Sequence, residues 1–386
     1  MTNRRKVVHV ITRLDFGGAQ QNTLWTVRHL NPEKYDVVLA SGQGGALDWE
    51  ARENSEKGIY RVAFFSSLVR EISPIRDLLA FFSLWRFFIA EKPDIVHTHS
   101  SKAGIIGRLA AWAAGVKIIV HTYHGFGFHD FQNPLVKKNY VLLERLCSHF
   151  THALIFVSRF NWDYALKNGI GPESRFHLIR SGVDLSRLPV KIEDRDHKKK
   201  ELGFDSEALL VVSIGNLKPQ KNPLDFVSMA ARVSEEIPQA RFMFIGDGPL
   251  RSKSENFARE LGVFEKIRFS GWRKDAAEWL AVADVFVLTS LWEGLPRALV
   301  EAMKSGLPCA AYAADGISEM IRDGENGFLI PVKDVEFLSK RVIELLRNPE
   351  LRRRMGFQAG KSITEEFDIN RMVQEQETLY TELLGD

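Results

Sequence analysis

Two carboxylates eight positions apart carry the strongest chemical signal in the chain. The segment EGLPRALVE begins at Glu293 and ends at Glu301, with Gly294 and Leu295 between them. Pro296 suits the first position of a helix, which places Glu293 before the helix and Glu301 in its second turn. Carboxylates accept hydrogen bonds from sugar hydroxyls, while N–H groups at a helix start bind phosphate. One segment could therefore hold both halves of a nucleotide sugar, although a surface helix with incidental glutamates would give the same pattern.

Two further loops combine glycine or lysine with the expected start of a helix. Gly17 and Gly18 follow the first apolar run, and glycines let backbone N–H groups approach an anion. In GNLKPQKNP, Lys218 and Lys221 precede another helical pattern. Lysines there oppose the helix macrodipole, so an anionic ligand would account for them. Either loop alone could be an ordinary turn, and neither has the GxGxxG spacing that indicates NAD.

The elements that must position these loops follow a regular rhythm. Short apolar runs alternate with amphipathic helical patterns, which predicts βαβ units and parallel sheets. Strands are expected at residues 6–11, 36–40, 95–98, 118–122, 153–157, 209–214, 241–245, 267–269, 285–288 and 309–311. Helices are expected at residues 20–30, 74–91, 102–114, 134–148, 223–236, 249–261, 296–305, 334–346 and 370–384. The charged stretch VKIEDRDHKKKELGF interrupts the rhythm and indicates a linker.

The predicted fold class is therefore α/β, with two Rossmann-like doubly wound domains facing a cleft. We expect an acceptor-binding domain over residues 1–182 and a donor-binding domain over residues 183–364. A C-terminal helix within about 365–386 is expected to pack back across the junction. Doubly wound sheets bind ligands at the carboxyl ends of their strands, so the chemistry is expected in the loops that follow strands.

Size and composition agree with this organisation. At 386 residues, with 45% hydrophobic and 26% charged residues, the chain suits two soluble globular domains rather than a disordered protein. Cys147 and Cys309 do not indicate a disulfide framework. The net charge of +3 is unevenly placed: residues 1–182 carry 23 Lys and Arg against 15 Asp and Glu, and residues 183–386 carry 29 against 34. Ten of the 11 histidines also lie in the first half. No apolar run is long enough for a signal peptide or a membrane span, so we expect a cytoplasmic protein.

Several motifs together resemble the retaining glycosyltransferases of family 4, which have the GT-B fold. Besides the three loops above, they are DIVHTHSSKAG, HTYHGFGF, VSRFN, IRSGVD, IGDGPL, ADVFVLTSLWEGLP and DGISEMIRDGENGFLIP. The resemblance covers nearly the whole chain, and bacterial enzymes of polysaccharide or lipid-linked oligosaccharide assembly are the most similar. It implies transfer of a sugar from a nucleotide-diphosphate sugar, expected to be a UDP-sugar. The acceptor would be a saccharide or a polyprenyl-diphosphate-linked saccharide, and no nucleic acid is expected to bind.

The resemblance also implies roles for individual residues in the donor site. Glu301 would hold the ribose hydroxyls and Glu293 the hydroxyls of the transferred sugar. Gly294 and Leu295 would offer backbone N–H groups, while Lys221 would neutralise the diphosphate. The remaining donor-site candidates are Gly17 and Gly18, which would close from the first domain, and Gly271, Trp272 and Arg273, where the family packs the base.

The chain departs from the family at one donor-site position. Asn216 stands where the family usually has arginine, so either Lys218 shares the charge or the diphosphate binds more weakly. On the acceptor side, His124 would lie beside the sugar and the nucleophile. His124, Lys221 and Glu293 are the catalytic candidates, and the acceptor-side set is His99, Lys102, His124, Phe126 and Phe128.

We expect no metal and no cofactor. Asp194-Arg195-Asp196 has a metal-binding DxD pattern but follows no strand, so it is interpreted as a solvated charged run. Cationic side chains and helix starts can stabilise a leaving diphosphate without a metal. No carboxylate is an obvious covalent nucleophile, which favours front-face attack, with the departing phosphate accepting the proton. The alternatives are an epimerase or phosphorylase of the same architecture, or a non-catalytic nucleotide-sugar-binding partner subunit, which only Asn216 favours.

Three further expectations concern histidines and apolar segments. His97 and His99 are expected to face opposite sides of a strand, with His99 reaching the cleft and His97 satisfied inside. The helix over residues 74–91 is expected to be buried in the first domain. The loop GFGFHDF, with Phe126, Phe128 and Phe131, is expected to give weak anionic-membrane contact on the inner face of the cell membrane, unless its rings fold inward over the acceptor cleft.

Overall fold

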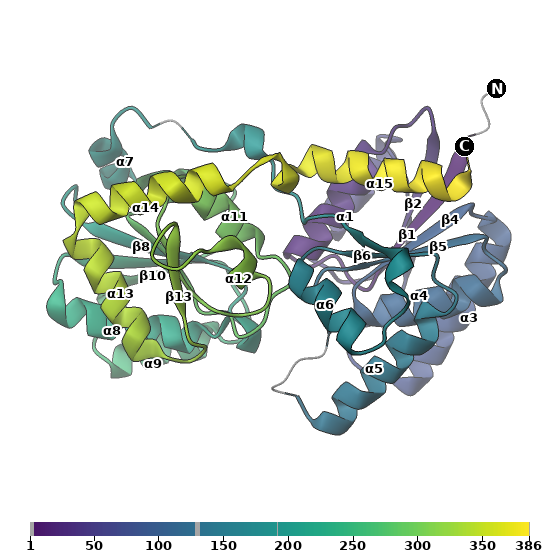
Figure 1. Cartoon of the computed structure of the whole chain (residues 1–386), viewed down its shortest axis with the longest axis horizontal. Coiled ribbons are helices and arrows are strands. Elements are labelled where there is room, and N and C mark those ends of the chain that lie inside the picture. Colours follow the sequence, from purple (N-terminus) through teal and green to yellow (C-terminus); the bar gives the residue numbers. More distant parts are fainter. Residues whose placement is uncertain (1–3, 128–131, 191, 386) are drawn as a thin grey trace. The chain divides into compact units, whose positions relative to one another are not determined.

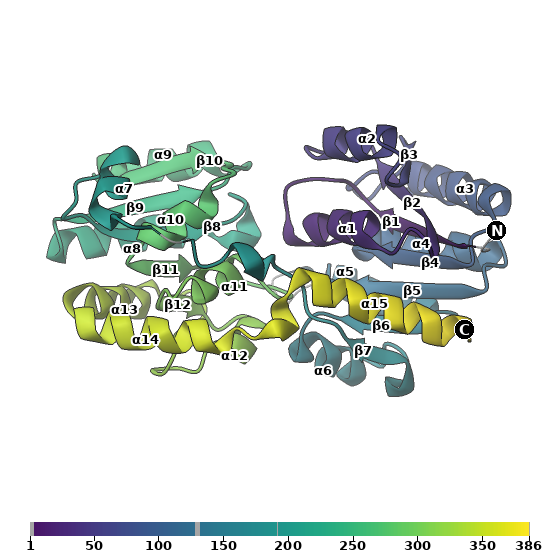
Figure 2. The same ribbon diagram turned by 90° about the horizontal axis from the view of Figure 1, so that it is seen from above.

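Val-, Ile- and Leu-rich runs form two parallel sheets, each covered by helices on both faces (Figure 1, Figure 2). The computed structural model describes residues 4–127, 132–190 and 192–385. One compact unit comprises Met1–Gly182 with Ile369–Asp386, and the other comprises Val183–Asp368. The predicted α/β class with two doubly wound domains is confirmed. The second unit ends at Asp368, whereas the sequence placed its end at residue 364.

The first unit contains a seven-stranded sheet with the order β3-β2-β1-β4-β5-β6-β7. Its strands are β1 (Arg5–Ile11), β2 (Tyr35–Gly42), β3 (Arg61–Phe65), β4 (Ile95–His99), β5 (Ile118–Tyr123), β6 (Ala153–Phe156) and β7 (Phe176–Leu178). Its helices are α1 (Gly18–His29), α2 (Asp48–Glu56), α3 (Pro74–Glu91), α4 (Ser101–Ala113), α5 (Pro134–Ser148), α6 (Arg159–Lys167) and α15 (Ile369–Leu384).

Helices cover both faces of this first sheet. The helices α1, α2 and α15 pack on the face that presents Val7, Ile95 and Val120. The helices α3 and α4 pack on the opposite face, against Val8 and Val96, and α5 and α6 extend that layer (Figure 1). Because both faces are covered, every residue of β4 and β5 is buried, including their histidines and threonines.

The second unit contains a six-stranded sheet with the order β10-β9-β8-β11-β12-β13. Its strands are β8 (Leu209–Ile214), β9 (Ala240–Ile245), β10 (Ile267–Gly271), β11 (Val285–Leu288), β12 (Cys309–Tyr312) and β13 (Gly327–Ile330). Its helices are α7 (Arg195–Glu201), α8 (Pro223–Glu236), α9 (Arg251–Glu260), α10 (Ala276–Val282), α11 (Arg297–Lys304), α12 (Ile317–Met320), α13 (Val335–Arg347) and α14 (Pro349–Ser362). The main apolar core lies between the sheet and α8, α9 and α13.

Each sheet has one point at which the strand order reverses. In the first unit β1 lies between β2 and β4, and in the second β8 lies between β9 and β11. Loops that leave neighbouring strands on either side of such a point diverge and leave room for a ligand at the carboxyl edge. In the second unit these are the loops after β8 and β11, which contain Lys221 and Glu293.

Two expectations about elements are wrong. The stretch interpreted as a linker contains α7, and the Asp194 carboxylate caps this helix by accepting a hydrogen bond from the N–H of His197 at 2.9 Å. The helix over residues 74–91 is only partly buried, because Ala80, Leu84 and Phe88 pack inward while Ile75, Leu78 and Phe82 are exposed. A helix that covers one face of a sheet needs only one apolar stripe. Packing on the sheet therefore does not explain the apolar residues on the outer face of α3.

Candidate functional site

The loops after β8 and β11 are held together by hydrogen bonds at the carboxyl edge of the second sheet. The hydroxyl of Thr289 donates to the backbone carbonyls of Lys221 (2.9 Å) and Asn222 (3.1 Å). The N–H of Leu291 donates to the carbonyl of Gln220 at 2.8 Å, and the Gln220 amide donates to the carbonyl of Trp292 at 2.9 Å. These bonds fix the position of one loop relative to the other.

The Lys221 ammonium and the Glu293 carboxylate form an ion pair across these two loops. Both side chains are largely buried, with 14% and 8% of their area exposed. The stem of Lys221 lies over Gly215, where a β-carbon would come within 3.2 Å of it. The backbone N–H of Glu293 donates to the Asp315 carboxylate at 2.8 Å. A cation and a carboxylate are thus held side by side at the sheet edge, where donor binding is predicted.

Glu301 lies in the second turn of α11, as predicted, and has a basic neighbour to which the sequence analysis assigned no role. The guanidinium of Arg297 lies 3.7 Å from the Glu301 carboxylate, one helical turn earlier. Burial raises the pKa of Glu301, and the Arg297 charge opposes that shift. Burial likewise lowers the pKa of Arg297. Pro296 occupies the N-cap with extended backbone rather than the first helical position, one residue from the prediction.

Glycines bring the loops after β8, β9 and β10 into backbone contact. The N–H of Gly246 donates to the carbonyl of Gly271 at 2.9 Å, and a β-carbon on Gly246 would lie 1.9 Å from the carbonyl oxygen of Gly215. Trp272 follows with 37% of its area exposed. The guanidinium of Arg273 makes hydrogen bonds of 2.7 and 2.6 Å to the Asp275 carboxylate.

The donor-site candidates of the second unit thus lie at strand ends, on loops or in the first two turns of a helix, all after strands β8, β10 and β11. The candidates after β8 are Asn216, Lys218 and Lys221, those after β10 are Trp272 and Arg273 with Gly271 at its end, and those after β11 are Glu293, Gly294, Leu295 and Glu301. Gly294 and Leu295 are buried between the ion pair and the start of α11. This grouping is what an extended ligand such as a nucleotide sugar requires.

In the first unit, the glycine loop leads into α1 as a plain helix start. Gly17 is the N-cap residue in extended conformation, and Gly18 is the first residue of the helix and is exposed. The helix therefore begins two residues before the predicted start at residue 20. The Arg13 guanidinium holds the Asp15 carboxylate at 2.9 Å beside this start.

Two acceptor-side candidates are engaged in packing within the first unit. The Lys102 ammonium pairs with Asp77 at 2.5 Å and also donates to the backbone carbonyl of Glu71, which ties α4 to the start of α3. Phe126 packs against the rings of Tyr123 and Tyr164, with centroids 4.9 and 5.0 Å away. Phe128 lies outside the described residues, as does Phe131.

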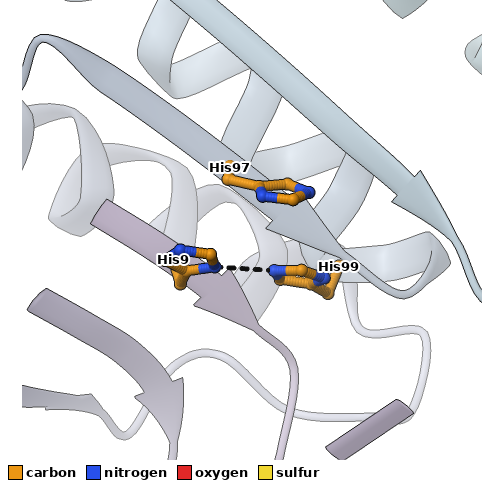
Figure 3. Close-up of side chains that lie close together, drawn as sticks. All are labelled: His9, His97 and His99. Carbon is orange, nitrogen blue, oxygen red and sulfur yellow. Dashed lines mark hydrogen bonds between the residues drawn. The ribbon is translucent and has the colours of Figure 1, made fainter. Parts of the chain in front are cut away.

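The prediction that His97 and His99 face opposite sides is wrong. Their ring centroids are 4.3 Å apart, because residues two positions apart on a strand share one face (Figure 3). His97 is buried and hydrogen-bonded, as predicted. Its Nδ1 lies 2.5 Å from the Tyr380 hydroxyl and its Nε2 lies 2.7 Å from the Thr122 hydroxyl. His99 is also buried, and its Nδ1 lies 3.2 Å from Nε2 of His124. Burial lowers the pKa of His124 to about 4.

The sequence interpretation assigned no role to several residues that lie close to the candidates. Among them, His9 contacts His99, Arg297 contacts Glu301 and Asp315 contacts Glu293. Tyr380 contacts His97 and His9. Arg297 could have been found from its spacing of four residues before Glu301, which allows a pair on one helix face. Asp315 is the first residue of the quoted motif DGISEMIRDGENGFLIP, but its contact with Glu293 joins separate loops. No sequence spacing predicts such a contact.

Comparison with known proteins agrees with this geometry. The family model described as Glycosyltransferase Family 4 matches residues 16–187, and the one described as Glycosyl transferases group 1 matches residues 194–362. A UDP-Gal:alpha-D-GlcNAc-diphosphoundecaprenol alpha-1,3-galactosyltransferase of Escherichia coli is 33% identical over 98% of this chain and 97% of its own. The putative glycosyltransferase EpsD of Bacillus subtilis (strain 168) is 33% identical over 75% of this chain and 76% of its own.

Solved structures show the same fold. HepE of Anabaena in complex with UDP matches with a TM-score of 0.81 at 19% identity, over 98% of this chain and 100% of that one. The sucrose-phosphate synthase of Thermosynechococcus elongatus matches with a TM-score of 0.85 at 18% identity, over 99% of this chain and 100% of that one.

The two doubly wound domains thus define a protein of the GT-B class. More particularly, the chain belongs to glycosyltransferase family 4 and is an enzyme that transfers a sugar. The predicted family is confirmed, and the epimerase, phosphorylase and non-catalytic alternatives are not retained.

Proposed function

We propose that this glycosyltransferase moves a hexosyl group from a UDP-sugar to a saccharide or lipid-linked saccharide, with retention of configuration, in cell-surface polysaccharide synthesis. The observation that carries the proposal is the Lys221–Glu293 pair at the carboxyl edge of the second sheet. The Escherichia coli relative, named for a UDP-galactose donor and a diphosphoundecaprenol-linked acceptor, supports the choice of substrates.

In this proposal the ion pair opens when the donor binds. The Lys221 ammonium turns to the diphosphate, while the Glu293 carboxylate accepts hydrogen bonds from the sugar hydroxyls. Glu301 accepts hydrogen bonds from the ribose, and the Arg297 charge beside it opposes the rise in pKa that burial causes. Trp272, partly exposed after β10, packs against the base. The same two charges therefore stabilise each other in the free enzyme and hold separate parts of the donor in the complex.

We assign the leaving-group charge to protein cations rather than to a metal. Lys221 is supplemented by Lys218, which lies on the same loop as Asn216, where the family usually has arginine. With Glu293 and Glu301 engaged by the donor, front-face attack is favoured, and the proton of the acceptor hydroxyl passes to the departing phosphate. Activity that survives an excess of chelator supports this proposal, whereas activity lost with chelator and restored by a divalent ion contradicts it.

Two measurements test the function itself. A thermal-shift screen of nucleotide sugars is expected to single out UDP-sugars, because a ligand that binds the folded state stabilises it by mass action. The selected donor is then incubated with a polyprenyl-diphosphate-linked N-acetylglucosamine, and the anomeric configuration of the product is read by NMR. A product of inverted configuration, or transfer from another nucleotide only, would contradict the proposal.

We also propose that the enzyme contacts an anionic membrane surface through the outer faces of α3 and α5. Phe126, the one ring of the GFGFHDF loop among the described residues, packs against Tyr123 and Tyr164, so we move the predicted contact to these helices. The exposed apolar residues are Ile75, Leu78, Leu79, Phe82 and Ile89 on α3, and Leu135, Val136, Leu142, Leu143 and Leu146 on α5. Their spacing places each set on one helix face.

The charge and the location of the two helices support a lipid surface as the partner of their exposed apolar faces. Arg76 and Arg86 are exposed beside the α3 stripe, and Lys138 and Arg145 beside the α5 stripe. The only acidic residue of α5, Glu144, is buried against Arg108, so the exposed charge of this helix is basic. Both helices lie on the same side of the first sheet, next to α4 (Figure 1). Among the described helices, none is long and apolar enough to cross a membrane.

A further inference from the structure

Six side chains form one connected hydrogen-bonded chain on the face of the first sheet that α15 covers. Nε2 of His124 lies 3.2 Å from Nδ1 of His99, and Nε2 of His99 lies 2.9 Å from Nδ1 of His9 (Figure 3). Nε2 of His9 lies 3.4 Å from the Tyr380 hydroxyl. That hydroxyl lies 2.5 Å from Nδ1 of His97, whose Nε2 lies 2.7 Å from the Thr122 hydroxyl. We call this set the histidine–tyrosine chain.

The register of the central strands creates this arrangement. His9 of β1 lies directly opposite His97 of β4, and His99 lies opposite Thr122 of β5. Because side chains alternate along a strand, all four point to the same face. Tyr380 comes from α15, which packs on that face, and His124 follows the end of β5.

Burial keeps these groups uncharged. It lowers the pKa of His9 to about 3 and lowers the pKa values of His97 and His99 well below the usual range. It also raises the pKa of Tyr380, which stays a phenol. A neutral imidazole has one donor and one acceptor, so fixing the proton on one ring fixes it on every ring connected to it. The chain therefore has two arrangements, in which every bond runs one way or the other.

The unequal bonds of Tyr380 select between these arrangements. A phenol is a better donor than an imidazole, so the shorter contact is the one in which the Tyr380 hydroxyl donates to His97. The hydroxyl oxygen then accepts from Nε2–H of His9, and His9 accepts from His99. His99 in turn accepts from Nε2–H of His124, which leaves Nδ1 of His124 with a lone pair. This Nδ1 is buried and makes no hydrogen bond to any described residue.

We propose that the histidine–tyrosine chain holds His124 in the Nε2–H tautomer, so that its Nδ1 accepts a hydrogen bond from the nucleophilic hydroxyl of the acceptor. The inference rests on the proposed acceptor role of His124. His9, His97, His99 and Tyr380 are positioning residues, because they act through His124. The histidine orients the hydroxyl by a hydrogen bond only, and the proton of that hydroxyl still passes to the departing phosphate.

His9, His97 and His99 could also form a metal site, so the test must distinguish a metal site from the hydrogen-bonded chain. Nitrogens of His9, His97 and His99 lie within 4.8 Å of one another. All six ring nitrogens of these residues, however, already have hydrogen-bond partners. A bound metal ion would have to displace several of these bonds.

The test removes one hydroxyl and reads the tautomer directly. Tyr380→Phe keeps the buried ring but breaks the chain between His97 and His9. Tyr35→Phe is the matched control, because its buried hydroxyl donates to the Glu377 carbonyl of α15 at 3.5 Å and lies outside the chain. Imidazole ¹⁵N NMR of the full-length protein, with His124 assigned from His124→Gln, reports which nitrogen is protonated.

The expected results differ between the two variants. Parent protein and Tyr35→Phe show His124 as the Nε2–H tautomer, whereas Tyr380→Phe shows a mixture and a kcat lower by about 10-fold, with donor KM unchanged. His9→Asn, which cannot reach Tyr380, gives the same tautomer mixture if Tyr380→Phe does not fold. An unchanged tautomer in both variants overturns the inference, as does a transition metal bound stoichiometrically to the purified protein. The NMR result stands independently of the substrate identity, so its failure is distinct from failure of the proposed function.

Discussion

At the scale of single residues, the proposed donor site is a set of charges that are already paired before a ligand arrives. Lys221 and Glu293 neutralise each other, and so do Arg297 and Glu301. Buried unpaired charges are costly, so pairing offsets part of the desolvation cost of keeping charged groups in a largely buried site. In the proposed complex the diphosphate replaces Glu293 as the partner of Lys221.

Lys221→Ala tests the cation of the first pair. We expect kcat to fall by about 10²-fold or more, because the developing charge on the diphosphate loses its main stabilising donor. Steady-state transfer kinetics give the value. Lys253→Ala removes an exposed lysine of α9 and is expected to leave kcat unchanged. A Lys221→Ala enzyme as active as Lys253→Ala would contradict the assignment.

The second pair should control nucleotide affinity. Glu301→Ala is expected to weaken UDP binding by about 10-fold, since a hydrogen bond to a charged group contributes about 1.5–3 kcal/mol. Arg297→Met removes the charge that opposes the raised pKa of Glu301, so the carboxyl stays protonated to higher pH. UDP binding to this variant should therefore weaken at a higher pH than in the parent. Titration calorimetry across a pH series checks both; equal pH profiles would remove Arg297 from the site.

At the scale of elements, the sequence predicts local structure better than contacts between loops. The start of α11 and the lysine loop after β8 can be predicted from the sequence, because the effects of glycine, proline and apolar periodicity on the backbone extend over only a few residues. The Lys221–Glu293 pair joins residues 72 positions apart and depends on β8 and β11 being neighbours. The charged stretch before β8 conceals α7, because a single short helix offers too few turns for an apolar period.

Apolar composition alone also could not tell which side of α3 faces the sheet and which faces outward. The exposed apolar side of α3 leads to a prediction about membrane binding. Wild-type protein is expected to co-sediment with vesicles containing phosphatidylglycerol, and less at high salt, because each basic residue near the surface contributes about 1 kcal/mol. Leu78→Ser with Phe82→Ser should reduce binding several-fold without changing donor binding.

The control for this experiment lies on another surface. Trp49→Ser removes an exposed apolar ring on α2, on the opposite face of the first sheet, and should leave sedimentation unchanged. Equal loss in both variants would indicate nonspecific hydrophobic binding and contradict the assignment of α3.

The contact between α4 and α5 depends on a buried ion pair. Arg108 and Glu144 pair at 2.5 Å with 0% and 1% of their side chains exposed, and the Tyr123 hydroxyl donates to the same carboxylate at 2.7 Å. Glu144→Leu leaves a buried guanidinium uncompensated and is expected to cost about 3–5 kcal/mol. Arg108→Met combined with Glu144→Leu should regain most of this. Urea unfolding measures each; a double variant no more stable than Glu144→Leu would contradict the argument.

At the scale of the whole molecule, the chain enters the second unit at Val183 and returns to the first at Ile369. The returning α15 completes the core of the first unit, where Tyr380, Met372 and Val373 are buried. The helix thus contributes a buried phenol that contacts His97, 283 positions away, and His9, 371 positions away. Length and periodicity predict the helix, but the strand order decides what it covers.

The buried histidines make the stability of the first unit depend on pH. The pKa values of His9 and His124 are lowered to about 3 and about 4, and those of His97, His99 and His121 also lie well below 6.5. Below about pH 6.5 the unfolded chain binds protons that the folded chain excludes, so stability falls as pH falls. For the fully buried His9, each pH unit in this window costs about 1.4 kcal/mol.

We therefore expect the free energy of unfolding to be flat from about pH 8 to about pH 7 and to fall steeply towards about pH 5, well before the carboxylates protonate. Urea unfolding at a series of pH values measures the slope. His9→Asn removes one titrating group and should make the slope shallower by about one proton, even if it lowers stability at neutral pH. His197→Asn, in the second unit and exposed, is the control and should leave the slope unchanged. A flat profile down to about pH 5 would show that these histidines are protonated in the folded chain, and would contradict the neutral rings on which the histidine–tyrosine chain depends.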